Sequence, residues 1–210
     1  MTFDTDTKHT YQLKYPGYAS ALYESLTADP FYITMEQSVS GQDARQRQAM
    51  LRYMDYSMIE AERFGILFIP KVHEYGVSIW SKTLPPETQA QRSAAKKRFL
   101  REHMGPKSLE TYHAIVETMS LHAQNLVDDR FWYLSIIGIL PQFQNQGLGP
   151  GLISDILEKA DQKGIPTYLE TFTPRNISFY QRLGYNSAGV FYEPTVRAEY
   201  TLMTRPAMPA

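Results

Sequence analysis

A polar loop with closely spaced glycines, QNQGLG at residues 144–149, is the first place where this chain could hold a ligand. An apolar run ends before the loop and a helical pattern follows it, which predicts a strand-to-helix junction. Glycine lets the backbone take positive φ and approach a ligand closely, and the free N–H groups and dipole of a helix start favour an anion. The loop therefore has the outline of a phosphate site, although its glycines could equally serve only to make a tight turn.

The glycine spacing argues against the two common nucleotide loops. The Walker motif requires GxxxxGK[ST], and no glycine in this stretch is followed by Lys-Ser or Lys-Thr. The dinucleotide fingerprint requires GxGxxG, whereas Gly147, Gly149 and Gly151 are spaced GxGxG. A phosphate bound here would therefore not be held as in either nucleotide fold.

Glu170 is a carboxylate in an otherwise apolar run, YLETF at 168–172, at the end of a predicted buried strand. Burial raises the pKa of a carboxyl group toward the range in which it exchanges protons near neutral pH. Glu170 is therefore a candidate general base. The structural alternative is a carboxylate that Arg175 or nearby backbone amides neutralise.

Tyr180 follows Asn176 by four residues, which places both side chains on one face of the short helix predicted here. A tyrosine hydroxyl is a neutral donor with an ordinary pKa of about 10, so Tyr180 could protonate a leaving group. Asparagine at a helix start is also a good N-cap, and a tyrosine on an amphipathic helix often belongs to the core. These structural alternatives stay open for both residues.

Several other chemistries are excluded by what the chain lacks. It has no cysteine, so a thiol in the reaction would have to come from a cofactor. His103, His113 and His122 lie too far apart to form a local ligand pair and no HExxH occurs, so no metal is assigned. No GxSxG elbow occurs either, which argues against a serine acyl-enzyme.

The candidate residues fall within a predicted β-loop-α-β unit. Apolar runs at 131–140 and 166–172 predict two buried strands, and the pattern at 151–164 predicts a helix between them. The connection has the length that a parallel crossover needs. Two more strands are predicted at 188–193 and 197–205.

Upstream, the chain is richer in helical patterns, with a β-hairpin around KVHEYG at 71–76. The basic cluster AAKKRFLREH at 94–103 indicates a solvated helix face rather than a binding patch, because acidic residues elsewhere balance its charge. Four helices are predicted, at 18–28, at 40–65 with Met50, Met54 and Met58 on its core face, at 86–104 and at 108–125.

Length and charge limit the class of protein. With 210 residues, 43% of them hydrophobic, the chain can bury a sizeable core as one domain. Lys plus Arg total 21 against 22 Asp plus Glu, so no positive field favours nucleic acid as a partner. The longest strongly apolar run is shorter than the roughly 18 residues of a membrane span, and the polar N-terminus is unlike a signal peptide. We therefore expect a cytoplasmic protein with no membrane partner.

Q-x-x-G-x-G at 144–149, between a strand and a helix, looks like the acetyl-CoA pyrophosphate loop of the GNAT superfamily of N-acetyltransferases. WYLSIIGILP, GIPTYLETFTPRNISFYQRLGY and the terminal MTRP resemble in particular the puromycin N-acetyltransferase group of that family. The resemblance is specific over about residues 131–206 and only faint upstream.

The resemblance implies a mixed α/β (α+β) fold in which helices flank a mostly antiparallel sheet with one parallel, splayed strand pair. One domain, 1–210, would comprise a helix-rich acceptor-side half, 1–130, and an acetyl-CoA-binding half, 131–206. Pro150 departs from the family pattern because it removes an N–H donor, and Gln146 often has a lysine equivalent. The implied acetyl-CoA contacts are backbone groups at Ile137, Gly138 and Ile139 for pantetheine, and Gln144, Asn145, Gln146, Gly147, Leu148, Gly149 and Pro150 for the pyrophosphate.

The implied reaction is direct transfer of an acetyl group from acetyl-CoA to the primary amine of a small molecule. Glu170 would help to deprotonate the amine, Tyr180 would protonate the leaving thiolate and contact the donor, and Asn176 would reach the CoA arm. Protein or peptide N-acetylation and non-catalytic acyl-CoA binding remain alternatives, and a homodimer stays open. Aromatic side chains that could line the acceptor pocket, with core packing as the alternative, are Tyr15, Phe31, Tyr32, Tyr53, Tyr56 and Trp80.

Overall fold

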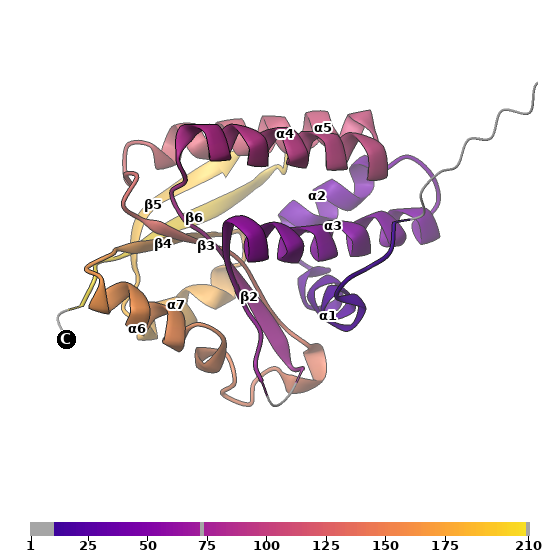
Figure 1. Cartoon of the computed structure of the whole chain (residues 1–210). Helices are drawn as coiled ribbons and strands as arrows, with labels where there is room; N and C mark the ends of the chain where they lie inside the picture. Colours follow the sequence, from indigo (N-terminus) through magenta and orange to yellow (C-terminus); the bar gives the residue numbers. More distant parts are fainter. Residues whose placement is uncertain (1–10, 72–73, 209–210) are drawn as a thin grey trace, which may run out of the picture.

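The computed structural model describes residues 11–71 and 74–208, and within them six strands form one sheet (Figure 1). The strand order is β1-β2-β3-β4-β6-β5, and all neighbouring strands are antiparallel except β3 and β4. This is the predicted mixed α/β architecture with one parallel pair. The strands are β1 Gly65–Phe68, β2 Gly76–Ser81, β3 Trp132–Ile139, β4 Thr167–Thr171, β5 Asn186–Glu193 and β6 Ala198–Arg205.

Helices cover both faces of the sheet, with α1 to α5 on one face and α6 and α7 on the other (Figure 1). No helix in the described ranges is long and apolar enough to cross a membrane. The α-helices are α1 Pro16–Leu26, α2 Pro30–Ser38, α3 Asp43–Phe64, α4 Pro86–His103, α5 Pro106–Ala123, α6 Ser154–Gln162 and α7 Ile177–Arg182; 3₁₀ helices occur at Pro141–Phe143, Pro150–Leu152 and Pro174–Asn176.

The predicted helices and the hairpin of β1 and β2 are all found, but the sequence pattern misses α2. Pro30 suggests the end of a helix, whereas it is the first residue of one, where the missing N–H would have no partner anyway. The Asp29 side chain caps this helix by accepting a hydrogen bond from the Phe31 N–H at 2.9 Å. The α2 helix matters for the site because it brings aromatic side chains to the cavity described below.

The parallel strands β3 and β4 separate after three residue pairs, the last of which joins Leu134 to Leu169. β3 continues to Ile139. Its backbone beyond Leu134 therefore has no strand partner on the side of β4, which is the splayed arrangement that the family resemblance implies.

A bulge at Ser135 exchanges the two faces of β3 just where the strands separate. Leu134 packs in the cluster beneath α6, whereas Ile136, two residues later, packs with α1 and α3 on the opposite face. Strand side chains alternate between faces, so one extra residue reverses the pattern. Tyr133 therefore points to the same side as Ile136, toward helices α3 to α5.

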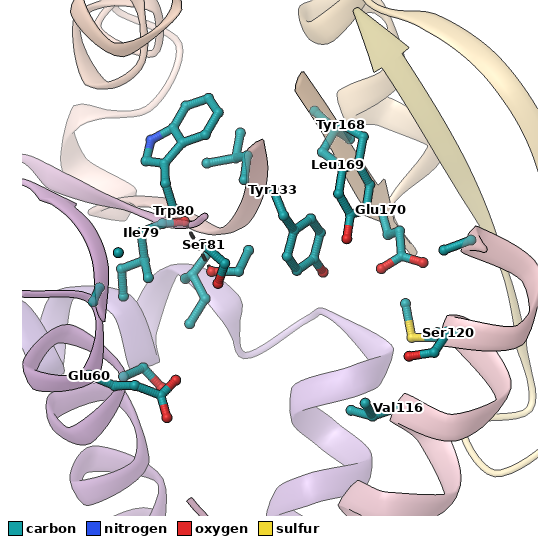
Figure 2. A pocket seen from close by; sticks show the side chains of 18 of the residues that line it. Glu60, Ile79, Trp80, Ser81, Val116, Ser120, Tyr133, Tyr168, Leu169 and Glu170 are labelled. Carbon is teal, nitrogen blue, oxygen red and sulfur yellow. Dashed lines mark hydrogen bonds between the residues drawn. The ribbon is translucent and has the colours of Figure 1, made fainter. Parts of the chain in front are cut away.

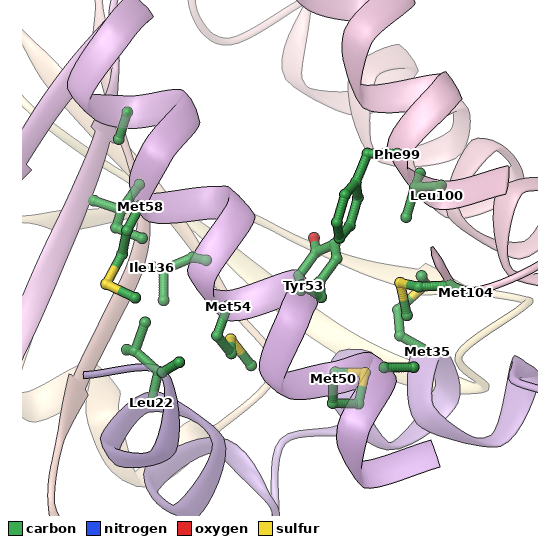
Figure 3. Close-up of a cluster of buried hydrophobic side chains, with 14 of the residues drawn as sticks. Leu22, Met35, Met50, Tyr53, Met54, Met58, Phe99, Leu100, Met104 and Ile136 are labelled. Carbon is green, nitrogen blue, oxygen red and sulfur yellow. The ribbon is translucent and has the colours of Figure 1, made fainter. Parts of the chain in front are cut away.

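The cluster on the α1 to α5 face confirms the predicted methionine pattern (Figure 3). Met50, Met54 and Met58 recur at helical spacing along α3 and are all at most 1% exposed. They belong to one buried cluster with residues of α1, α2, α4, α5 and the sheet, which positions α3 along the cavity that it borders.

Candidate functional site

A cavity of about 1010 Å³ lies between the sheet and helices α3, α4 and α5. It reaches the point where β3 and β4 separate, and Figure 2 shows side chains of both strands pointing into it. Glu170, Asn176 and Tyr180 all line this one cavity, although they belong to separate elements. Of the predicted aromatic liners, the cavity contacts Phe31, Tyr32, Tyr53 and Trp80 but not Tyr15 or Tyr56.

Glu170 forms a group with Tyr168 and Tyr133 on the cavity side of the two strands (Figure 2). Tyr133 and Tyr168 are paired across β3 and β4, and their rings stack with centroids 4.6 Å apart. Glu170 lies two residues beyond Tyr168 and therefore faces the same way. Strand alternation thus places its carboxylate at the separation point, directed into the cavity. The sequence signal for Tyr133 and Tyr168 is their alternation with buried apolar neighbours.

The environment of Glu170 suits proton transfer. Burial raises the pKa of its carboxyl group to about 7, and the neighbouring Tyr133 hydroxyl opposes part of this shift. Its Oε1 atom is buried and has no hydrogen-bond partner in the described part of the chain. Arg175 is exposed, and no ion pair joins it to Glu170 within residues 11–71 and 74–208. Arg175 therefore does not neutralise Glu170, whose carboxylate is instead beside the Tyr133 hydroxyl, and its role as a base stays a prediction.

Tyr180 and Asn176 reach the cavity from α7 and from the 3₁₀ turn that precedes it. Tyr180 is only 5% exposed and belongs to the cluster beneath α6, so it is a core residue as well as a cavity residue. Burial raises the pKa of its hydroxyl well above the ordinary value, so the group keeps its proton and can donate it. Asn176 makes no side-chain capping hydrogen bond to α7, so the N-cap explanation is wrong and its amide is available to a ligand.

The loop at 144–149 presents a row of unused backbone donors. No hydrogen bond among the described residues uses the N–H groups of residues 145–149. Asn145 and Gly147 have φ of 60° and 74°, and backbone that alternates in this way forms concave anion sites. The Gln144 side chain donates from Nε2 to the Ile139 carbonyl at 3.0 Å and ties the loop to the end of β3. This arrangement fits a phosphate or pyrophosphate, and it does so without a basic side chain in the loop.

Pro150 begins a 3₁₀ turn, and α6 starts only at Ser154, later than the helix start predicted at 151. The first residue of a helical turn needs no N–H partner, so proline is tolerated there. The N–H groups of Gly151 and Leu152 donate to carbonyls just before them. These two N–H groups of the turn are therefore not available to an anion, whereas those of the loop are.

The backbone of β3 beyond the bulge presents Ile137 and Ile139 to the gap beside β4. Leu140 donates its N–H toward β2, to the carbonyl just before that strand, at 3.0 Å. Backbone groups alternate along a strand, so those of Ile139 and Ile137 point the opposite way, into the gap. Gly138 does not share this orientation: its backbone faces β2, and a Cβ added there would lie 2.5 Å from Ser25 Oγ on α1.

Three charged residues in another part of the cavity are missed by the sequence patterns. Glu60 of α3 accepts a hydrogen bond from Arg92 Nη2 at 3.1 Å and lies 3.7 Å from Lys96 Nζ. Lys96 belongs to the basic cluster predicted to be a solvated face, yet it is 8% exposed, so that prediction is wrong for this residue. The available signal was the spacing of Arg92 and Lys96, which are four residues apart and so share a helix face.

Comparison with protein-family models matches residues 72–185, more than half of the chain, to the family described as Acetyltransferase (GNAT) family. Among curated proteins, the chain is similar to an uncharacterized N-acetyltransferase, C550.08, from Schizosaccharomyces pombe. The two are 36% identical over 58 residues, which are 28% of this chain and 24% of that protein. The chain therefore matches only about a quarter of the length of this curated relative.

Two solved structures share the fold over nearly their whole length. A Corynebacterium glutamicum protein described as histone acetyltransferase HPA2 and related acetyltransferase superposes with a TM-score of 0.60, at 16% identity over 95% of both chains. Arylalkylamine N-acetyltransferase 2 from Aedes aegypti gives a TM-score of 0.57 at 14% identity, covering 91% of this chain and 95% of the other. Because the sequence identities are this low, the two structures show that the fold is shared and nothing about the substrate.

Proposed function

This chain belongs to the GNAT family of acetyltransferases, and we propose that it moves an acetyl group from acetyl-CoA directly to the primary amine of a small molecule. The observation that carries the proposal is the position of Glu170. A buried carboxylate with a pKa of about 7 faces a large cavity at the point where two parallel strands separate. Acetyl-CoA is the acetyl donor of the family, and its thioester supplies an activated acyl group when it is bound.

Three segments of the chain would hold the donor. The unused N–H groups of residues 145–149 suit the pyrophosphate, and the backbone groups of Ile137 and Ile139 that face the gap suit the pantetheine amides. Asn176, whose side chain caps no helix, lines the cavity and could reach the donor from there. Pro150 leaves the loop with one donor fewer than the family pattern, so the remaining loop donors carry the anion contact.

Glu170 serves as the base for the acceptor amine. An alkyl amine with an ordinary pKa of about 10.4 is neutral in only about one molecule in 2,500 at about pH 7. Glu170 takes up the excess proton, directly or through a water molecule, so that the nitrogen lone pair can attack the thioester carbonyl carbon. A new C–N bond then replaces the C–S bond. Of the two protons that nitrogen loses, one remains on the carboxylate or passes to solvent, and the other restores the proton that the thiolate sulfur receives.

Tyr180 serves the other side of the transfer. Its hydroxyl keeps its proton at neutral pH and lines the cavity, so it can donate to the sulfur as the C–S bond breaks. Backbone N–H groups of β3 beyond the bulge stabilise the carbonyl oxygen as it becomes negative, and removing one such donor typically costs about 2.7 to 4 kcal/mol.

A small acceptor suits the cavity better than a protein does. Its volume of about 1010 Å³ and its aromatic lining are typical of sites that enclose small molecules. Arylalkylamine N-acetyltransferase 2, which shares the fold, acts on such an amine by its description. We therefore favour a small molecule over a peptide acceptor.

The direct test measures thiol release from acetyl-CoA over a panel of primary amines. Glu170→Gln and Tyr180→Phe should each lower kcat/KM by about 10² to 10⁴, the usual contribution of a positioned acid or base. Tyr192→Phe is the matched control, because Tyr192 is 56% exposed on β5, away from the cavity.

Unchanged turnover in both cavity variants would remove these residue roles. Tight CoA binding without thiol release on any amine would instead favour a non-catalytic acyl-CoA-binding protein.

A further inference from the structure

The cavity carries a second polar group, formed by Glu60, Arg92, Lys96 and Ser81, on a side that the acetyl-transfer chemistry does not use. Figure 2 shows Glu60 and Ser81 across the space from Glu170. The Glu60 and Lys96 side chains are 9% and 10% exposed, and that of Arg92 is 23% exposed. All four residues line the cavity, so this group borders the space in which an acceptor would bind.

Arg92 is held in place and still has unused donors. Its Nη2 atom donates to Glu60 Oε2 at 3.1 Å and to Ser81 Oγ at 2.9 Å. Its Nε and Nη1 donors have no hydrogen-bond partner among the described residues. A guanidinium presents five N–H donors in a planar fork, which matches the two oxygens of a carboxylate.

Lys96 is occupied by protein contacts and does not compete for the same ligand. Its Nζ lies 4.7 Å from the centre of the Tyr53 ring and 5.0 Å from that of Tyr56, and its carboxylate partner is Glu60. Burial lowers the pKa of Lys96, and Arg92 acts in the same direction, while Glu60 opposes the shift.

The charges on this side favour an anion over a second cation. Two basic side chains share one carboxylate, so an added cation would meet repulsion, whereas a carboxylate would compensate the partly buried guanidinium. Tyr168 lies within the electrostatic influence of both Glu170 and Arg92. The cavity therefore holds a carboxyl group and a guanidinium, both of which act on Tyr168.

We propose, on the basis of the acetyl transfer argued above, that the acceptor is an amino carboxylate whose carboxylate binds Arg92 while its amine faces Glu170. The substrate class is a primary amine with a carboxylate on the same small molecule. A simple alkylamine or a diamine lacks the group that Arg92 recognises.

The kinetic test compares matched acceptors that differ only in the group other than the reacting amine. One set is 6-aminohexanoate, hexylamine and 1,6-diaminohexane, and the other is phenylalanine and phenethylamine. Shorter ω-amino acids added to the first set vary the distance between amine and carboxylate. We expect at least one amino carboxylate to exceed its matched amine at least about tenfold in kcat/KM, because hydrogen bonds between charged groups are the strong ones.

Variants of α4 identify the group responsible. Arg92→Gln should abolish the preference for the carboxylate, and Arg92→Lys should retain part of it because the charge remains. Arg98→Gln, an exposed residue on the same helix that does not line the cavity, is the matched control and should leave the preference unchanged. Circular dichroism and thermal unfolding check that each variant is folded.

A binding measurement separates this inference from the proposed function. Calorimetric titration with N-acetylphenylalanine and with N-acetylphenethylamine needs no turnover, and the same pair of N-acetylated products can be made for the six-carbon set. The N-acetylated carboxylate should bind wild type at least about tenfold more tightly than the N-acetylated amine without the carboxylate. In Arg92→Gln the two compounds should bind with similar affinity.

Carboxylate-dependent binding through Arg92 without thiol release would support the inference and refute the proposed acetyl transfer. Acetylation of alkylamines or diamines as fast as the amino carboxylates, or N-acetylated carboxylates that bind no better than their matches, would overturn the inference while leaving the acetyl transfer in place.

Discussion

At the scale of single residues, Glu170 determines the pH range in which the proposed reaction can run. Burial raises the pKa of its carboxyl group from 4.5 to about 7, and only the ionised form can accept a proton. The tyrosines that face it, Tyr133, Tyr168 and Tyr200, have pKa values raised above their ordinary range by burial, so they keep their protons near neutral pH. These tyrosines therefore do not titrate in the range of the Glu170 carboxylate.

We expect kcat/KM to rise with pH through about 7 and to level off above it, in profiles from about pH 5 to about pH 9. Glu170→Gln should lose this limb together with most of its activity, while the exposed-residue control Tyr192→Phe keeps it. A wild-type limb near pH 4.5, the ordinary carboxyl pKa, would contradict the assignment.

Gln144, Gly147 and Gly149 show which features of the loop the residue types alone predict. Glycine and glutamine types at this spacing are enough to suggest an anion loop, and Gly147 indeed has positive φ. The sequence does not predict that the Gln144 side chain donates a hydrogen bond to the Ile139 carbonyl. This bond depends on the path by which the loop returns to the end of β3.

At the scale of elements, the contact between α1 and β3 depends on a glycine. A Cβ at Gly138 would lie 2.5 Å from Ser25 Oγ and 2.8 Å from Leu22 Cδ2, and both residues belong to α1. Leu22 is fully buried, so its side chain and that of Ser25 would have to shift within a packed region. The resemblance assigns Gly138 to cofactor contacts, whereas its position in the fold indicates a packing requirement.

Gly138→Ala should therefore destabilise the fold by about 1 to 3 kcal/mol, the usual cost of overpacking a core. Thermal unfolding monitored by circular dichroism measures the effect. Adding Ser25→Ala should recover part of the loss because it removes the nearest atom. A melting temperature equal to that of wild type in Gly138→Ala would show that α1 accommodates the methyl group freely.

The elements themselves were predictable wherever local patterns decide them. Methionine spacing marks α3, and the apolar runs mark β3 and β4, because periodicity depends on neighbouring residues alone. The bulge at Ser135 was not predictable, since it arises from the register between β3 and β2 and leaves no local signal. It nevertheless decides that Tyr133 faces the cavity.

At the scale of the whole molecule, the proposed site lowers stability at high pH. The folded-state pKa of Glu170 lies above its ordinary value of 4.5, so the fold favours the protonated carboxyl. This contribution to stability is complete below pH 4.5 and is lost as pH rises through about 7.

Glu170→Gln should therefore melt at a higher temperature than wild type at about pH 8, and this advantage should shrink at about pH 5, because glutamine resembles the neutral carboxyl. Thermal unfolding at the two pH values provides the measurement. A variant that is less stable than wild type at about pH 8 would show that the ionised carboxylate is stabilised by partners in the fold.

The sequence alone determined the order of helices and strands apart from α2, and the parallel pair. It also predicted an anion loop at 144–149 and the candidate trio of Glu170, Asn176 and Tyr180. These features follow from periodicity, turn chemistry and residue type, which act over a few neighbouring positions. Only the tertiary structure decided that the trio shares one cavity with Glu60, Arg92 and Lys96. The physical reason is that burial, pKa and pairing depend on residues brought together from distant parts of the chain, as the approach of α4 to α3 does for Lys96.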